Sequence, residues 1–375
     1  MGIKEVKAKS ILRTQNKIES WFLSYYGMNL YRGCSHNCVY CDGRSEKYRV
    51  DGEFGEDVAV KINAVDVLRR ELNFKRKHGS SKKGYILVGG GVGDSYQPAE
   101  NKYRLTRKAL ELLTVYDYPV HVLTKSTLVK RDFDLLKKIN DKKRVIVSFS
   151  FSSADDKISK VFEPGVPPPS ERLEVMRFFK ENGIAIGMFL LPVIPFITDK
   201  PDVMHETVRK ASDVGVDFII FGGMTLKDGK QKDYFFRTLQ RSYPELVVDY
   251  HNIYKDDKWG NAVGEYYDSI NQIFYAITKE YKIPRRIPPY LYSDILSEND
   301  LVIVILEHID YLLKLQGKKS SYGFAAYSIS KLKQPLSSMK NDLQSINGVG
   351  KVTDGIIREI LNTGRSSYYE KLLIG

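Results

Sequence analysis

Residues 33–41 read Gly33-Cys34-Ser35-His36-Asn37-Cys38-Val39-Tyr40-Cys41, and this stretch contains all three cysteines of the 375-residue chain. An odd, closely spaced set of cysteines is a poor disulfide framework but a plausible metal site. Iron–sulfur clusters usually take four cysteine ligands, and no fourth cysteine exists here. The motif therefore predicts that Cys34, Cys38 and Cys41 hold three irons of a [4Fe–4S] cluster and leave one iron open to a non-protein ligand.

A zinc site with His36 as its fourth ligand is the alternative interpretation of this loop. Closed zinc sites usually combine two separated pairs of ligands, whereas these four residues all lie within one short loop. The spacing therefore favours the cluster and leaves zinc as the minor hypothesis.

Composition and charge narrow the class of protein. Hydrophobic residues make up 42% and charged residues 28% of the chain, which is ordinary for a globular protein and argues against disorder. The formal net charge of +12 favours a polyanionic partner such as nucleic acid. The N-terminus lacks a signal-peptide pattern, and the longest apolar run, residues 184–197, is interrupted by prolines and too short to span a membrane. We therefore expect a soluble protein of the reducing cytoplasm.

Between about residues 28 and 225 the sequence alternates strand-like and helix-like patterns, which is typical of a parallel sheet wrapped by helices. The predicted strands are Asn29–Gly33, Tyr85–Val88, Val120–Thr124, Arg144–Phe151, Ala185–Pro192 and Asp217–Phe221. The predicted helices are Val65–Lys77, Lys102–Val115, Ser170–Asn182 and Asp202–Val214. Six such units predict an α/β fold, a partial (β/α)6 barrel whose chemistry lies in the loops after the strands.

A second, smaller unit follows a proline-rich linker. Residues 226–283 are Tyr-rich and helical in pattern, and the basic stretch Ile283–Tyr290 contains three prolines that exclude a helix interior. We place the linker near residues 284–298, because the sequence from Leu301 onward is helical throughout. The sequence thus predicts a barrel domain over residues 1–295, with extensions at both ends, and an all-α domain over residues 298–375.

The spacing Cys-x3-Cys-x-aromatic-Cys resembles the signature of the radical S-adenosylmethionine (SAM) superfamily, with Tyr40 at the aromatic position expected to touch adenine. The resemblance implies that SAM binds the open iron and that one-electron reduction cleaves it to methionine and a 5′-deoxyadenosyl radical. It also implies an electron donor such as flavodoxin or ferredoxin. In such enzymes the cofactor performs the hard chemistry and the protein orients the reactants.

Further segments at strand ends resemble the spore photoproduct lyase-like branch of this superfamily, over roughly residues 20–295. They are Gly93–Glu100, Leu123–Ser126, Ser148–Ser150, Glu163–Gly165 and Pro192–Pro195. The resemblance implies that the glycine-rich strand end receives the SAM amino group and that several polar side chains contact the ribose or carboxylate. The implied SAM-binding residues are Tyr40, Gly90, Gly91, Asp94, Lys125, Ser148, Ser150 and Arg172.

The chain departs from the lyases at one position that matters for chemistry. The photoproduct lyase is believed to return a hydrogen atom through an additional cysteine, and this chain has no cysteine outside the cluster loop. Lyase-type reversal by that route is therefore in doubt. Tyr96 is the candidate catalytic residue for a hydrogen relay, and the competing interpretation is that its hydroxyl only orders the loop.

The segment Ile346–Ile360 matches a helix-hairpin-helix, in which a tight Gly-x-Gly turn at Gly348 and Gly350 starts a helix. Backbone N–H groups at such a turn can hold a DNA phosphate without reading bases. The wider stretch resembles the small N-terminal domain of family X DNA polymerases. This resemblance implies a grip on gapped, nicked or damaged DNA, with charge added by Lys351, Arg358 and Arg365.

Three functional hypotheses follow from these observations. The first is a radical SAM enzyme that acts on DNA in repair or modification, for which a base must leave the stack at a cost of a few kcal/mol. The second keeps the radical chemistry but changes the target to RNA, a protein or a small metabolite. The third is a non-catalytic DNA-binding iron–sulfur protein, which would not bind SAM.

Overall fold

A curled, seven-stranded half-barrel forms the centre of the molecule in the computed structural model, which describes residues 2–48, 52–77, 82–89, 92–255, 257 and 259–375. Its strand order is β10-β9-β8-β7-β6-β3-β2, and all neighbours from β3 to β10 are parallel. The strands are β2 (Leu12–Glu19), β3 (Ser24–Met28), β6 (Tyr85–Gly89), β7 (Val120–Thr124), β8 (Val145–Phe151), β9 (Ala185–Val193) and β10 (Phe218–Gly223). The predicted α/β partial barrel is confirmed.

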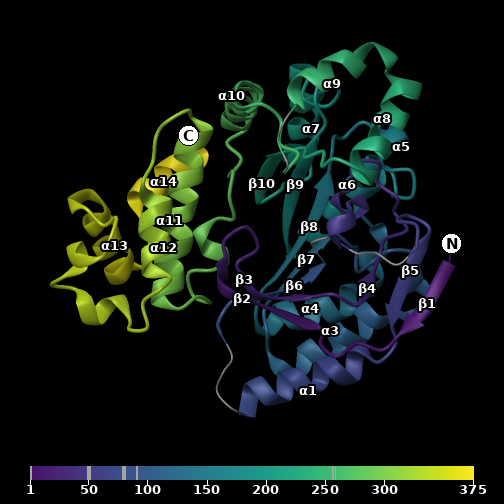
Figure 1. Cartoon of the computed structure of the whole chain (residues 1–375). Helices are drawn as coiled ribbons and strands as arrows, with labels where there is room; N and C mark the ends of the chain where they lie inside the picture. The colour runs from purple at the N-terminus through teal and green to yellow at the C-terminus, as the bar shows by residue number, and fades with distance from the viewer. Residues whose placement is uncertain (1, 49–51, 78–81, 90–91, 256, 258) are drawn as a thin grey trace.

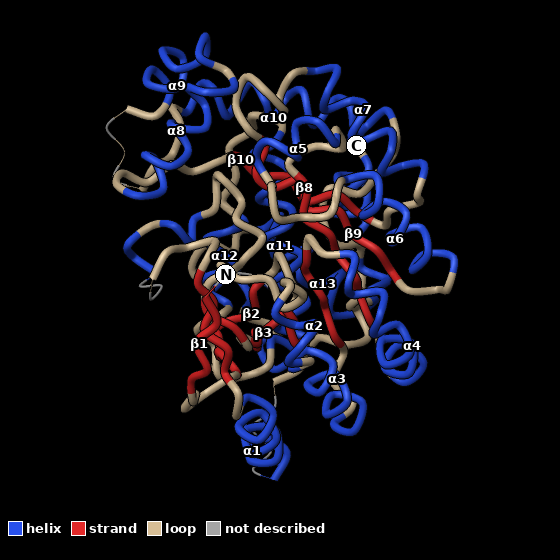
Figure 2. Tube along the Cα trace, turned by 90° about the vertical axis from the view of Figure 1, so that its right-hand side faces the viewer, coloured by secondary structure: helices blue, strands red, loops and turns tan. Residues whose placement is uncertain are grey.

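Helices cover the outer face of this sheet. The central strands are therefore buried on both faces, and their sequences are continuous apolar runs. Figure 2 shows these helices as an arc beside the strands. They are α1 (Ala64–Lys77), α2 (Ala99–Tyr103), α3 (Leu105–Tyr116), α4 (Phe133–Lys142), α5 (Asp156–Phe162), α6 (Pro169–Glu181) and α7 (Pro201–Asp213). After β10, the segments α8 (Lys230–Ser242), α9 (Val247–Ile253) and α10 (Gly264–Glu280) cover the end of the barrel.

Two predicted elements differ in the structure. The strand predicted at residues 29–33 is wrong, because the first parallel strand is β3 and only β4 (Tyr31–Arg32) follows it. β4 belongs to a separate three-stranded sheet with β5 (Asp57–Lys61) and β1 (Gly2–Val6). The single helix predicted over residues 102–115 is two helices, since Arg104 adopts the left-handed conformation at φ 53° and breaks it.

Four helices make up the C-terminal part, which lies to the left of the half-barrel in Figure 1. They are α11 (Glu298–Leu315), α12 (Tyr322–Ile329), α13 (Lys351–Thr363) and α14 (Ser367–Ile374). Within the part of the chain that the structure describes, every helix falls short of the length and apolar character that a bilayer crossing demands.

Helix α11 bridges the two edge strands of the half-barrel. At one edge, Lys17 on β2 donates a hydrogen bond to Glu307. At the other edge, the Tyr311 hydroxyl donates to the carbonyl oxygen of Phe221 on β10 at 3.4 Å. Apolar side chains of α11 are buried nearly all round its axis, because the barrel lies on one side and α12 to α14 on the other. The barrel and the C-terminal helices therefore share one core.

Candidate cluster and cofactor site

The three cysteines line one cavity of about 330 Å³ at the carboxyl ends of the parallel strands. Cys34 and Cys38 are buried and Cys41 is partly exposed. The same cavity is lined by Thr124 at the end of β7 and by Lys125 directly after it. Other lining residues from the strand ends and loops are Tyr40, Asp94, Ser150, Leu191, Pro192 and Met224. The loops that follow the strands thus bring together residues that are distant in the sequence, as expected for a barrel mouth.

Buried polar side chains fix the path of the cysteine loop. The guanidinium of Arg44 donates to the carbonyl oxygens of Cys38, at 3.2 Å, and Asn37, at 3.3 Å, and its carbon lies 3.4 Å from the ring centre of Tyr234. The Gln97 amide donates to the Gly33 carbonyl oxygen at 3.1 Å, and its own oxygen accepts from the backbone N–H of Ser35 at 3.1 Å. Gln97 therefore holds the start of the loop, and Arg44 holds its middle.

The loop after α5 also closes onto the cysteine loop. The N–H of Gly165 donates to the carbonyl oxygen of His36 at 3.0 Å. A Cβ atom on Gly165 would lie only 2.6 Å from the Ser35 carbonyl oxygen and 2.8 Å from that of His36. Only glycine permits this approach of two backbones, which explains the Glu-Pro-Gly sequence at this point.

A buried carboxylate, Glu163, lies at the centre of the polar groups beside the cavity. It accepts hydrogen bonds from Lys125 Nζ at 3.1 Å, from Arg172 Nη2 at 2.7 Å and from the Tyr40 hydroxyl. Burial alone would raise its pKa, but the Arg172 and Lys125 cations outweigh that effect and hold the pKa well below its usual range. Glu163 is therefore ionised and fixes Lys125 and Tyr40, both of which line the cavity.

Asp94 organises the neighbouring loop. Its carboxylate accepts from the backbone N–H of Lys125 at 2.8 Å, from the Thr124 hydroxyl at 2.8 Å and from the N–H of Tyr96 at 2.7 Å. His36 Nδ1 lies 3.5 Å from the same carboxylate. Burial lowers the pKa of His36.

The residues predicted from the sequence divide into two groups. Tyr40, Asp94, Lys125 and Ser150 line the cavity together with the three cysteines. Ser148, Arg172 and Tyr96 are buried and do not line it. Gly90 and Gly91 lie outside the described residues.

Ser148, Arg172 and Tyr96 each contact groups outside the lining of the cysteine cavity. The Ser148 hydroxyl lies 2.8 Å from His121 Nε2, deep in the barrel. Arg172 reaches Glu163 and the Ser150 carbonyl oxygen from the outer helix α6. Tyr96 lines an adjoining hollow, and burial followed by the charge of Asp132 raises its pKa.

The thiols suit a polynuclear cluster. Burial raises the pKa of the Cys34 thiol to about 12 and also raises the pKa values of Cys38 and Cys41. A bound metal deprotonates a coordinating thiol outright, so metal binding would offset this burial. Among the described residues, no three His, Cys, Asp or Glu side chains converge on a point where one metal ion could bind. A cubane cluster places each thiolate on a different iron, so the three thiols need not converge.

Sequence reasoning missed the roles of Glu163 and Arg44. Glu163 lies in a Glu-Pro-Gly segment that stood out only as a likeness and was expected after a strand, whereas it follows helix α5. Its two cations come from the end of β7 and from helix α6, so no local pattern in the sequence joins them. Arg44 had no signal in the sequence, because its bonds to Asn37 and Cys38 follow no regular spacing and the ring that its guanidinium covers belongs to Tyr234, which is distant in sequence.

The C-terminal hairpin has the geometry that its sequence predicts. Gly348 has φ +85°, and helix α13 begins directly after Gly350 with no side chain capping its first N–H groups. Lys351 is exposed and has no ion-pair partner among the described residues. Arg358 and Arg365 instead form ion pairs with Asp354, at 2.6 Å, and with Glu370, at 2.7 Å. The N–H groups and Lys351 are therefore the groups best placed to meet a phosphate.

Comparison with known families agrees with this geometry. The profile of the radical SAM superfamily matches residues 28–208, and that of a helix-hairpin-helix domain matches residues 297–366. The chain belongs to the radical SAM superfamily and carries a C-terminal helix-hairpin-helix domain. Membership of this superfamily implies a [4Fe–4S] cluster and SAM as cofactors.

Individual relatives and solved structures are also similar to this chain. An uncharacterized protein of Mycobacterium tuberculosis (strain H37Rv) is 31% identical over 234 residues, which cover 61% of this chain and 67% of the relative. One of Methanocaldococcus jannaschii is 32% identical over 221 residues, covering 59% and 77%. A mutant spore photoproduct lyase aligns with TM-score 0.56 and 16% identity over 74% of this chain and 79% of the lyase. A lyase variant with bound AdoMet and dinucleoside spore photoproduct aligns with TM-score 0.53 and 17% identity over 72% and 78%. The half-barrel thus has the lyase fold.

Proposed function

We propose that this radical SAM enzyme acts on DNA, in repair or modification, and holds its cluster through Cys34, Cys38 and Cys41. The observation that carries the proposal is the set of three thiols lining one cavity in a chain with no fourth cysteine. A [4Fe–4S] cluster held by these three thiols would supply the electron for reductive cleavage of SAM, and with it the chemistry of hydrogen-atom abstraction from the substrate. A flavodoxin or ferredoxin would supply that electron.

The side chains around the cavity would orient SAM. Lys125 Nζ lies 5.6 Å from the ring centre of Tyr40, and both are fixed by Glu163. We assign the adenine-facing position to Tyr40 and polar contacts to Lys125, Ser150 and Asp94. Arg172 keeps Glu163 ionised and acts as a positioning residue, since it does not line the cavity.

DNA is the substrate class that the C-terminal domain favours. Its hairpin offers the uncapped N–H groups of α13, a form of phosphate site that does not read sequence. The net charge of +12 adds non-specific attraction to nucleic acid. We assign the phosphate contacts to Gly348, Gly350 and Lys351, with longer-range charge from Arg358 and Arg365.

The test is anaerobic reconstitution of the cluster, followed by incubation with SAM and dithionite and chromatographic assay of 5′-deoxyadenosine. We expect 5′-deoxyadenosine, and more of it when gapped, nicked or irradiated DNA is present than with intact duplex. The C34A/C38A/C41A variant should bind no cluster and form none. An intact cluster that neither binds nor cleaves SAM would contradict the enzymatic proposal, whereas cleavage indifferent to every form of DNA would contradict the choice of substrate.

A further inference from the structure

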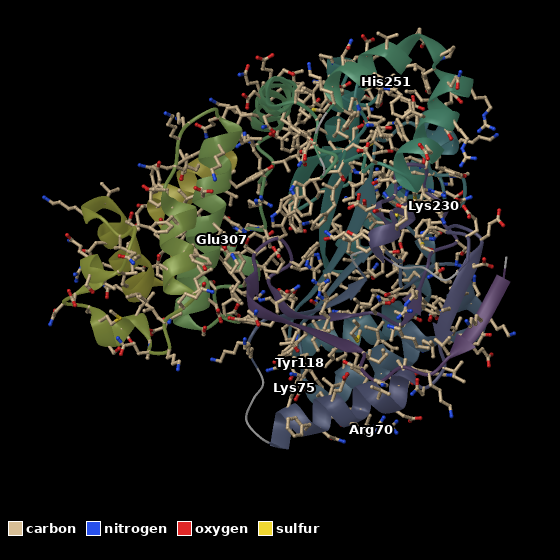
Figure 3. All side chains as sticks on the ribbon, in the orientation of Figure 1. Arg70, Lys75, Tyr118, Lys230, His251 and Glu307 are labelled. Carbon is tan, nitrogen blue, oxygen red and sulfur yellow. The ribbon has the colours of Figure 1, made fainter. Side chains whose placement is uncertain are left out.

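A second large hollow, of about 860 Å³, lies at the end of the half-barrel opposite the cysteine cavity. It is lined where β6, β7 and β8 begin, by Gly84, Pro119 and Arg144 among others. Figure 3 shows two of its lining residues, Lys75 and Tyr118, at the lower edge of the molecule. Because the seven residues of β8 each rise about 3.3 Å, roughly 20 Å of sheet separates this hollow from the cysteine cavity.

Basic side chains dominate the lining of this hollow, which we call the basal groove. Of its described lining residues, the charged ones are Lys75, Lys82, Lys83, Lys142, Lys143, Arg144, Asp117 and Asp294. Helices α1, α3 and α4 also end here, and cations at helix C-termini commonly do no more than balance the helix dipole. Three helix ends contribute about −0.5 charge each, so after both carboxylates an excess of about 2.5 positive charges remains. The helix dipoles and the two carboxylates therefore do not neutralise all the cations that line the groove.

The cations of the basal groove differ in how far they are engaged. Arg144 forms an ion pair with Asp294 at 2.8 Å, and Lys142 lies 3.8 Å from Asp117. Lys75 lies over the ring of Tyr26 at 4.3 Å. Lys83 and Lys143 are exposed and have no ion-pair partner among the described residues. These two lysines are the cations most available to an external anion.

A short chain of contacts joins the basal groove to the helix-hairpin-helix domain. Lys82 Nζ lies 4.4 Å from the ring centre of Tyr25, and the Tyr25 hydroxyl donates to Asp300 at the start of α11. The next side chain, Asn299, donates to the Gln334 carbonyl oxygen at 3.0 Å and accepts from the N–H of Leu336 at 2.9 Å. The loop it holds contains the exposed lysines Lys331, Lys333 and Lys340. The basal groove and this loop are thus neighbours on either side of the N-terminus of α11.

We propose that the basal groove binds the phosphate backbone of the DNA duplex that the helix-hairpin-helix domain engages, as a second and independent anchor. The inference rests on the proposed DNA substrate. Duplex DNA carries closely spaced phosphates, which match lysines spread along a groove better than a single small anion would. A backbone anchor of this kind fixes position without reading sequence. It would hold duplex beside the target while leaving the cysteine cavity free.

The test compares salt-dependent DNA binding of the reconstituted protein with that of a groove variant. K83E/K143E removes two unpaired cations, and R177E/R241E changes the charge by the same amount at exposed residues of α6 and α8 outside the groove. The probes are an intact 30-base-pair duplex and the same duplex with a one-nucleotide gap, followed by fluorescence anisotropy. We expect K83E/K143E to lose about tenfold in affinity and to reduce the slope of log K against log salt by about two, since each phosphate contact contributes about 0.9. R177E/R241E should keep the full slope.

Three results separate this inference from the proposed function. Formation of 5′-deoxyadenosine without DNA should be equal in K83E/K143E and the unaltered protein, because the groove is remote from the cysteine cavity. Equal slopes in the two double variants would overturn the basal groove as an anchor, even if DNA stimulates SAM cleavage. A groove variant that binds both duplexes normally but no longer binds vesicles containing phosphatidylserine would also overturn it, in favour of a membrane surface.

Discussion

His308 Nε2 on α11 lies 3.1 Å from the carbonyl oxygen of Ser20, in the turn between β2 and β3, while its Nδ1 lies 2.8 Å from the Tyr369 hydroxyl on α14. The carbonyl can only accept, so Nε2 carries the proton and Nδ1 accepts from Tyr369. This neutral imidazole joins the barrel to the C-terminal helices. Burial, and then the charge of Arg286, lowers its pKa to about 3.

The first prediction is a loss of stability in mild acid. The pKa of His308 is about 3 in the folded protein and about 6.5 in the unfolded chain. Between these pH values only the unfolded chain binds the proton, so lowering the pH favours unfolding. The free energy of unfolding should therefore fall by about 2 kcal/mol between pH 7 and pH 5 from this residue. Urea unfolding followed by Trp21 fluorescence measures it. His308→Gln keeps a donor toward Ser20 and should lessen the acid dependence, and an unchanged dependence would contradict the assignment.

The second prediction concerns Glu163. Glu163→Gln removes the carboxylate that pairs Arg172, whose side chain is fully buried. A buried cation left without a counter-charge costs about 3–5 kcal/mol, and we expect a loss of that order in urea unfolding. Ser159→Ala is the matched control, because it removes a 3.1 Å hydroxyl bond to the same carboxylate and a 3.2 Å bond from Arg172 but leaves the ion pair intact, and it should cost less, about 1–2 kcal/mol. Equal costs for the two variants would show that the ion pair contributes little.

The parallel strands were predictable because a strand buried on both faces reads as an unbroken apolar run. Val120–Thr124 matches β7 at both ends, and the predicted Arg144–Phe151 differs from β8 by one residue. β1 and β2 carry many exposed polar side chains, so their sequences give no such run. The helix break at Arg104 was equally hidden, since a left-handed arginine carries none of the glycine signal that usually marks it.

The sequence predicted those site residues whose positions follow from the order of the parallel strands alone. Lys125 directly follows β7 and Ser150 lies near the end of the neighbouring strand β8, and their side chains meet at 2.9 Å. Ser148 and Ser150 share a face of β8, because side chains alternate along a strand, but depth in the barrel separates them. Ser148 meets His121 deep in the barrel, whereas Ser150 reaches the cavity. Ser148 lies two residues earlier along β8, and its partner His121 also packs against Phe22, a residue distant in the sequence.

The third prediction distinguishes two glycines of the hairpin. Gly348 has φ +85°, and a Cβ there would lie 2.6 Å from Phe324 and 3.1 Å from the backbone nitrogen of Ala325. Gly348→Ala should therefore distort the turn and weaken both DNA binding and thermal stability. A Cβ at Gly350 would meet nothing within 4 Å, so Gly350→Ala should keep the thermal midpoint. Circular dichroism melting and DNA anisotropy measure the two effects, and equal melting of both variants would contradict this account.

The fourth prediction tests the contact between the loop after α5 and the cysteine loop. Gly165→Ala would force a methyl group against the carbonyl oxygens of Ser35 and His36, which are backbone atoms that cannot rotate away. The two loops must then separate, and we expect iron and sulfide per chain to fall well below those of the unaltered protein after identical anaerobic reconstitution.

Gly355→Ala is the control for that substitution, because it lies in α13 with open space around it. A helix-interior alanine should raise stability by about 0.5–1 kcal/mol while the iron content stays unchanged. If Gly165→Ala retains its full iron and sulfide and unfolds at the same urea concentration as the unaltered protein, the loop after α5 does not shape the cysteine loop. A loss of iron in Gly165→Ala alone would instead assign the Glu-Pro-Gly segment to the cluster site, because its only change is a methyl group directed at the backbone between Cys34 and Cys38.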